Sequence, residues 1–67
     1  MFKCEIRTGG AAFHSEKSEM DPFLDREIVG QEVSRLLKKI AMEIQRGSDY
    51  GSIIDLNGNK VGEWSLE

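Results

Sequence analysis

The chain has 67 residues, of which 39% are hydrophobic and 31% charged, and its 12 acidic and 9 basic residues give a net charge of −3. This composition is typical of an ordinary folded domain and excludes a disordered chain. The charge balance disfavours nucleic acid and anionic lipid as partners, because both attract basic surfaces. A domain of this size buries only about 60% of its unfolded surface. We therefore expect one domain, 1–67, without cofactors. Since a lone cysteine and a lone histidine provide neither a disulfide nor a metal site, we expect oligomerisation to stabilise it.

No apolar run approaches the roughly 20 residues that span a bilayer, and the N-terminus lacks the apolar region of a signal peptide. We therefore expect no membrane segment and a cytoplasmic location, where the single Cys4 stays reduced.

The first predicted element is a strand over residues 2–7, where apolar and charged side chains alternate strictly. Its apolar face consists of Phe2, Cys4 and Ile6. A two-residue turn at the glycine pair 9–10 would place Ile6 opposite Phe13 and make residues 11–14 a second strand. Two alanines disfavour that strand, so the sequence leaves three or four strands open.

A long helix from Pro22 to Arg46 is the strongest predicted element. Asp21 caps its start, proline suits the first helical position, and Gly47 marks its end. Apolar residues fall within a stripe of about 100° that would face a core. The stripe consists of Val29, Val33, Leu36, Leu37, Ile40 and Ile44.

The last segment predicts a β-hairpin with two alternative registers. A type I′ turn on residues 57–58 pairs Ile54 with Val61, whereas a type I turn over residues 55–58 with a glycine bulge pairs Ile53 with Val61. The two registers expose opposite strand faces, because they differ by one residue.

Aspartate at the first turn position and glycine at the fourth favour the bulged register. Trp64 and Leu66 would then share the face that carries Ile54. The complete pattern predicts an α+β fold, in which one long helix packs across a small antiparallel sheet of three to four strands.

Catalytic and metal-binding patterns are weak throughout. Cys4 and His14 would flank the same turn, but Cys4 lies on the inward face and no third residue orients the imidazole. The acidic residues of segment 16–27 lack the spacing of a calcium loop, and the glycines do not form a phosphate-binding loop. We therefore expect no catalytic, cofactor-binding or metal-binding residues, and a protein that is not an enzyme.

Basic residues form a ridge on the helix side opposite the apolar stripe. The basic ridge consists of Arg35, Lys38, Lys39 and Arg46. Such a ridge could contact nucleic acid, but no aromatic residues lie between the cations, and Glu32 and Glu43 border them. A solvent-exposed face is the favoured interpretation, and a nucleic-acid-associated accessory protein is the alternative.

Small residues form a line on one shoulder of the apolar stripe, namely Gly30, Ser34 and Ala41. They serve either packing on the chain's own sheet or close approach of a second subunit. The helix would be about 37 Å long, whereas strands of six residues span about 20 Å. Either the helix breaks near Gly30, or its excess contacts a second copy through the shoulder and through Phe23, Leu24 and Ile28.

Three segments together resemble a loose group of small uncharacterised bacterial and phage or prophage proteins. They are "EIRTGGAAF", the helix "EVSRLLKKIAMEIQRG" and the hairpin "IIDLNGNKVGEW". The resemblance covers most of the chain except the acidic segment before the helix. It implies a compact accessory protein and brings no catalytic residues. The leading hypothesis is therefore a non-enzymatic, homodimeric interaction module that binds an unknown protein through its sheet or helix shoulder.

Overall fold

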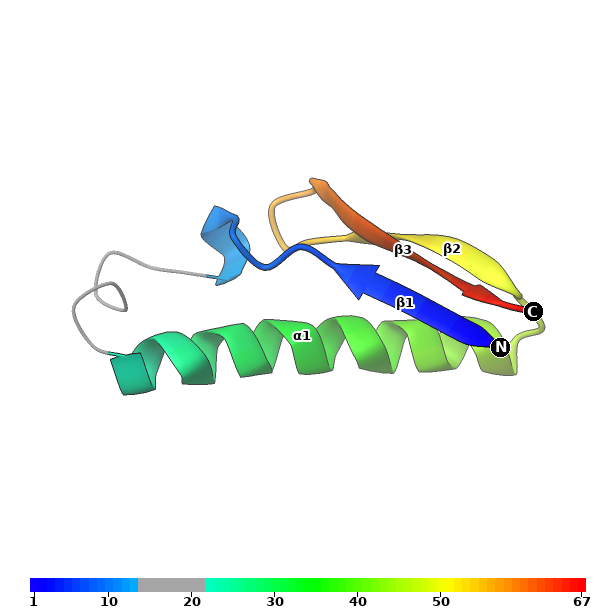
Figure 1. Ribbon diagram of the computed structural model, residues 1–67, viewed down its shortest axis with the longest axis horizontal. Coiled ribbons are helices and arrows are strands. Elements are labelled where there is room, and N and C mark those ends of the chain that lie inside the picture. The colour runs from blue at the N-terminus through cyan, green and yellow to red at the C-terminus, as the bar shows by residue number, and fades with distance from the viewer. Residues whose placement is uncertain (14–21) are drawn as a thin grey trace.

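The computed structural model describes residues 1–13 and 22–67, with side chains described outside 14–25 (Figure 1). The elements in chain order are β1 (Phe2–Ile6), the 3-10 helix η1 (Ala11–Phe13), α1 (Pro22–Gln45), β2 (Tyr50–Ile54) and β3 (Lys60–Leu66). The strands form one antiparallel sheet in the order β1-β3-β2, and α1 lies across one face of it. The predicted α+β fold is confirmed, with three strands. No helix in the described part of the chain is long and apolar enough to cross a membrane.

The segment after β1 forms η1 and not a second strand. The Phe13 N–H donates to the Gly10 carbonyl at 3.0 Å, which closes a turn of 3-10 helix. The Phe13 side chain is fully buried, and it anchors η1 in the core. The four-strand alternative is therefore wrong, because alanines favour a helical turn over an extended strand here. His14, and with it the proposed pair with Cys4, lies outside the described residues.

Helix α1 begins at Pro22 as predicted and ends at Gln45, one residue before the predicted end. Gly47 has φ +99°, and two hydrogen bonds complete a Schellman cap. The Ser48 N–H donates to the Glu43 carbonyl at 3.1 Å, and the Gly47 N–H to the Ile44 carbonyl at 3.0 Å. The helix runs without interruption through residue 30, so the alternative of a break there is wrong.

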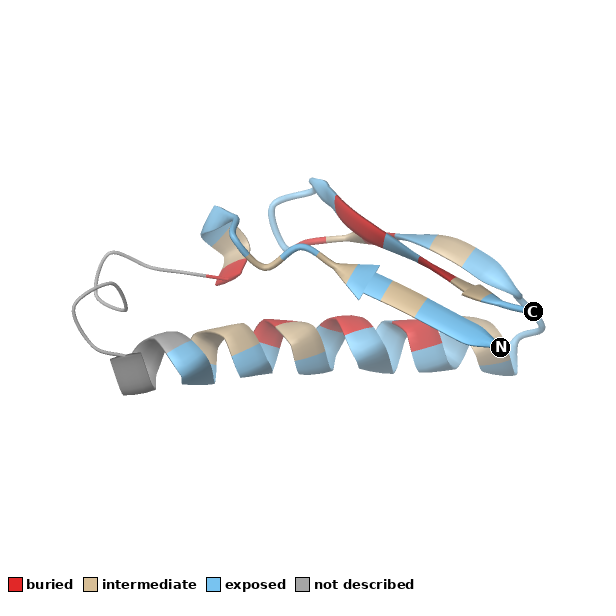
Figure 2. Ribbon diagram, in the orientation of Figure 1, coloured by how far each residue is buried: buried red, intermediate tan, exposed pale blue. Residues whose placement is uncertain are grey.

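The buried core lies between α1 and the inner face of the sheet (Figure 2). It consists of Phe13, Leu36, Ile40, Ile53, Val61 and Trp64. The predicted stripe is confirmed at Leu36 and Ile40 and, with partial burial, at Val29, Val33 and Ile44. Leu37 is 46% exposed, so its assignment to the core is wrong. It lies at the margin of the stripe, about 100° from Leu36 around the helix axis.

The hairpin turn is the type I turn with a glycine bulge that the sequence favours. The Gly58 N–H donates to the Asp55 carbonyl at 3.1 Å, and Gly58 has φ +84°. The Asp55 carboxylate accepts the Asn57 N–H at 2.9 Å and the Asn59 N–H at 2.8 Å. The buried Asp55 carboxylate is therefore hydrogen-bonded, and it stabilises the conformation of the turn.

A second irregularity shifts the register beyond the turn. Ile54 pairs with Lys60, whereas Ile53 pairs with Gly62, so Val61 is an additional residue of β3. The predicted pairing of Ile53 with Val61 is therefore wrong. The side chains of Ile53 and Val61 are nevertheless both buried in the core.

This bulge reverses the predicted faces of the rest of β3. Trp64 lies opposite Gly51 and shares the inner face with Ile53, and its side chain is 2% exposed. The expectation that Trp64 and Leu66 share a face with Ile54 is wrong, because one extra residue changes the parity of the strand. The bulge therefore places the only tryptophan in the core.

Candidate interaction surfaces

Cys4 belongs to the inner face of the sheet. It pairs with Trp64 across β1 and β3 and packs against the core in a partly buried position, which confirms its predicted inward orientation. Within residues 1–13 and 26–67, no three histidine, cysteine, aspartate or glutamate side chains are grouped as metal ligands.

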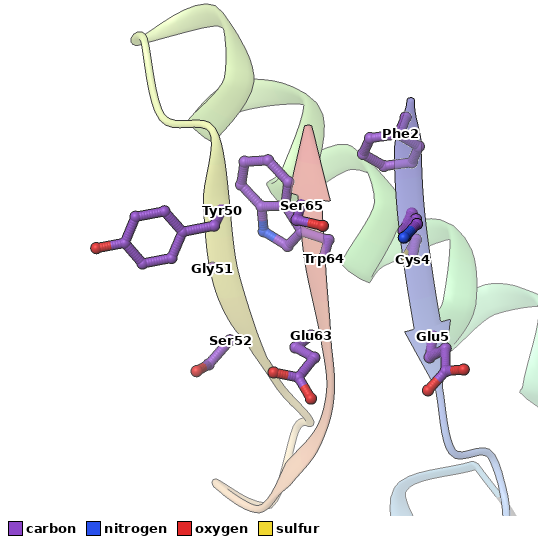
Figure 3. Close-up of a pocket in the computed structure, with 10 residues that line it drawn as sticks. Phe2, Cys4, Glu5, Tyr50, Gly51, Ser52, Glu63, Trp64 and Ser65 are labelled. Carbon is purple, nitrogen blue, oxygen red and sulfur yellow. The ribbon is translucent and has the colours of Figure 1, made fainter. Parts of the chain in front are cut away.

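The outer face of the sheet carries a shallow hollow that both polar and apolar residues line (Figure 3). Two rows of paired residues cross it. The first row is Lys3, Ser65 and Tyr50, and the second is Glu5, Glu63 and Ser52. The two glutamates of the second row stand directly opposite each other, which is unfavourable for like charges. These charged and hydroxyl side chains are those of a solvated sheet face, so the hollow by itself indicates no ligand.

The outer edge of β2 carries backbone groups that point away from the sheet. The Leu66 N–H donates to the Asp49 carbonyl at 2.7 Å, and the Asp55 N–H donates to the Asn59 carbonyl at 2.8 Å. Since backbone groups of an antiparallel strand alternate in direction, the odd-numbered residues of β2 bond to β3. The even-numbered residues direct their N–H and C=O groups toward the free edge, and they are Tyr50, Ser52 and Ile54.

The two edge strands of the sheet differ in charge. β1 carries Lys3 and Glu5, and charged residues on an edge strand discourage pairing with another chain. β2 has the sequence YGSII, without a charged residue or a proline. Tyr50 is 76% exposed, and its ring lies on the free side of β2 (Figure 3). β2 is therefore the less protected edge.

Glu32 connects α1 to the hairpin turn. Its side chain is 7% exposed and accepts the Leu56 N–H at 2.9 Å, together with two hydrogen bonds from Arg35 at 2.7 and 3.0 Å. The Arg35 hydrogen bonds lower the pKa of the Glu32 carboxyl, the Leu56 N–H adds to this effect, and burial opposes it. The same hydrogen bonds raise the pKa of Arg35. Glu32 borders the basic ridge through Arg35, as its sequence position predicts, and it also contacts the hairpin turn.

Glu43 makes the second polar contact between α1 and the sheet. Its carboxylate accepts the Trp64 Nε1–H at 3.1 Å, a contact that was not predicted from the sequence. Glu32 and Glu43 are eleven residues apart, which returns to nearly the same helix face after three turns. That spacing is the sequence signal that could have indicated both contacts.

The basic ridge is only partly free to bind a partner. Arg35 is paired with Glu32. Lys38, Lys39 and Arg46 are exposed and make no ion pair with any described residue. Lys39 lies one turn before Glu43 and Arg46 one turn after it, so both cations flank the side of α1 that contacts β2.

The shoulder of small residues is open. Gly30, Ser34 and Ala41 are exposed, as is Leu37 beside them, and a Cβ at Gly30 would meet no atom within 4 Å among the neighbours considered. The alternative in which these residues pack on the chain's own sheet is therefore wrong. Ile28 is half-buried, and the side chains of Phe23 and Leu24 lie outside the described part.

Comparisons with protein-family models, curated proteins and solved structures find no match for this chain. The function is therefore inferred from the surfaces described above.

Proposed function

We propose that the protein is a small, non-enzymatic, cytoplasmic interaction module that forms a homodimer through the α1 shoulder and binds a second protein. The contact would consist of the shoulder residues Gly30, Ser34 and Ala41 together with Leu37 beside them. The observation that carries the proposal is the exposure of this shoulder, with Leu37 46% exposed among residues small enough to admit a second helix.

The lengths of the elements support a second copy as the occupant. α1 has 24 residues and is about 36 Å long, whereas the longest strand, β3, has seven residues and spans about 24 Å. η1 covers part of the remaining helix through Phe13. A two-fold contact between α1 shoulders would bury Leu37 on both copies and enlarge a small core.

Light scattering coupled to size exclusion at micromolar concentration tests the dimer. We expect twice the monomer mass for the wild type and the monomer mass for Ala41→Glu, because a carboxylate at close helix approach is desolvated without a partner. Met42→Glu is the matched control, since Met42 is a neighbouring exposed residue that points away from the shoulder. A monomeric wild type, or equal effects of the two substitutions, would remove the proposed dimer.

The alternative function is nucleic-acid binding by the basic ridge. Three exposed cations without described ion pairs favour it, but the net charge of −3 and the engagement of Arg35 weaken it. A salt titration of binding to single-stranded and duplex DNA separates the two proposals, because neutralisation of several phosphates gives a steep salt dependence. Absent or salt-independent binding would exclude the alternative.

A further inference from the structure

We infer that the free edge of β2 accepts an extended acidic segment of the partner protein as a fourth strand of the sheet. The inference deepens the proposed function, because it rests on a protein partner and specifies its binding segment. The segment would carry apolar side chains on the outer sheet face and a carboxylate on the face toward α1.

Backbone geometry supplies the first argument. Tyr50, Ser52 and Ile54 each direct one N–H and one C=O toward the free edge, and these are the groups that an added antiparallel or parallel strand would bond. No charge or proline interrupts the edge. Three consecutive outward positions match a segment of about five residues, the usual length of a short strand.

Side chains on the outer face define the apolar part of the segment. The side chains of Tyr50, Ser52 and Ile54 share the face opposite the core, where Tyr50 is largely exposed. Residues of the added strand opposite Tyr50 and Ile54 would lie on the same face. Aromatic and β-branched cross-strand pairs are stabilising, so β-branched residues fit these positions.

Charges on α1 define the other face of the segment. Gly51 lies over Glu43, since a Cβ there would be 3.2 Å from the Glu43 carboxylate, and Leu56 bonds to Glu32. The five residues from Gly51 to Leu56 and the eleven from Glu32 to Glu43 both cover about 16 Å, so positions along β2 correspond to positions along α1. Ile53 then lies at the level of Lys39. A carboxylate opposite Ile53 would therefore be within reach of Lys39.

A second copy of the chain fits this edge less well. Two-fold pairing of β2 about Ser52 would use all the outward backbone groups, but it would place Asp49 opposite Asp55 of the other copy. It would also bring the Lys39 and Arg46 sides of both helices together. The two aspartates would repel each other at the ends of the paired strands, whereas a short acidic segment opposite Ile53 meets the complementary charge of Lys39.

A peptide titration followed by NMR tests the inference. The probe is a capped peptide of alternating valine and glutamate, and its control replaces every glutamate by lysine. We expect saturable binding of the acidic peptide, about fivefold tighter than the basic one, with slower hydrogen exchange at the amides of Ser52 and Ile54.

Ser52→Pro provides the blocking variant. The Ser52 N–H points to the free edge, so proline removes no bond to β3 while it obstructs an incoming strand. We expect about tenfold weaker peptide binding for Ser52→Pro, unchanged binding for Ser52→Thr, and loss of the charge preference for Lys39→Glu.

Three results would overturn the inference. The first is the absence of saturable binding at millimolar peptide, and the second is peptide binding that Ser52→Pro leaves unchanged. The third is a peptide-free protein with a mass above that of a dimer, which Ser52→Pro lowers. This third result would assign the β2 edge to a second copy of the chain. The titration is repeated on Ala41→Glu, which changes the opposite side of α1. A monomeric wild type that still binds the peptide would refute only the proposed dimerisation. A dimeric wild type that does not bind the peptide would refute only the added strand.

Discussion

Replacement of Glu32 by glutamine removes the charge of the side chain that ties α1 to the hairpin turn, while its shape is kept. The Leu56 N–H would still find an amide oxygen at the position of the carboxylate. Arg35 would lose its ionic partner. The variant therefore measures how much the negative charge contributes to the free energy of unfolding.

The magnitude follows from the exposure of each partner. A hydrogen bond to a charged group contributes about 1.5–3 kcal/mol and a neutral one about 0.5–1.5 kcal/mol, so the Leu56 contact loses about 1–1.5 kcal/mol. The Arg35 side chain is 42% exposed, and solvent screening reduces its ion pair to about 0.3–0.5 kcal/mol. We expect a total loss of about 1.5–2 kcal/mol, which lowers the melting temperature by about 6–16 °C in a domain of this size.

Urea and thermal unfolding monitored by circular dichroism measure both values. Arg35→Gln is the matched control, because it removes the exposed partner and leaves the Leu56 hydrogen bond; we expect a loss below about 1 kcal/mol. An equal or larger loss for Arg35→Gln, or a loss below about 0.5 kcal/mol for Glu32→Gln, would refute the view that the buried carboxylate fastens the turn to α1.

The difference in unfolding free energy between wild type and Glu32→Gln should depend on pH. Because the folded-state pKa of Glu32 is lowered, chiefly by the Arg35 hydrogen bonds, its charge contributes stability fully above the unfolded-state pKa of about 4.5. That contribution is lost as pH falls toward the folded-state pKa. The stability difference between wild type and Glu32→Gln should thus be constant near neutral pH and shrink below about pH 4.5. A difference that persists or grows in acid would contradict the assignment.

Three further predictions concern the sheet, the hairpin turn and the core. Gly62→Ala should destabilise by at least about 2 kcal/mol in urea unfolding, because the new Cβ would overlap with the Glu5 carbonyl oxygen, while Gly9→Ala should be tolerated since no atom lies within 4 Å. Gly58→Val should cost at least about 1 kcal/mol at φ +84°, and an unchanged melting temperature would contradict the turn. Cys4 should react slowly with thiol reagents in the folded protein, and Cys4→Ala should lower stability without changing the dimer mass; rapid labelling would contradict its inward position.

The elements that follow from local signals were predictable from the sequence. The start of α1 at Pro22, its end near Gly47 and the type I turn from Asp55 to Gly58 all depend on residues within a few positions of one another. The fold class follows from the same elements, because a long amphipathic helix beside short alternating strands has few ways to bury its apolar stripe.

The bulge at Val61 was not predictable in this way. Nothing in the segment "KVGEW" determines which residue of β3 becomes additional, because the choice depends on pairing with two strands at once. Gly62 lies opposite Ile6 on one side and Ile53 on the other, and the lack of a side chain allows the close approach of β1. A single added residue then decides that Trp64 faces the core.

The inward contacts of two glutamates on α1 were not predicted from the sequence. Glu32 and Glu43 carry the helix contacts to the turn and to Trp64, and with these contacts the helix has two unlike flanks. The flank near β2 carries polar contacts and exposed cations, whereas the shoulder with Ala41 carries small and apolar residues. Because the two flanks lie on opposite sides of α1, a dimer formed through the shoulder would leave the β2 edge of each copy accessible. The proposed dimer would therefore hold two partner segments at once, and its apparent affinity for a partner with two such segments should exceed that of a monomeric variant.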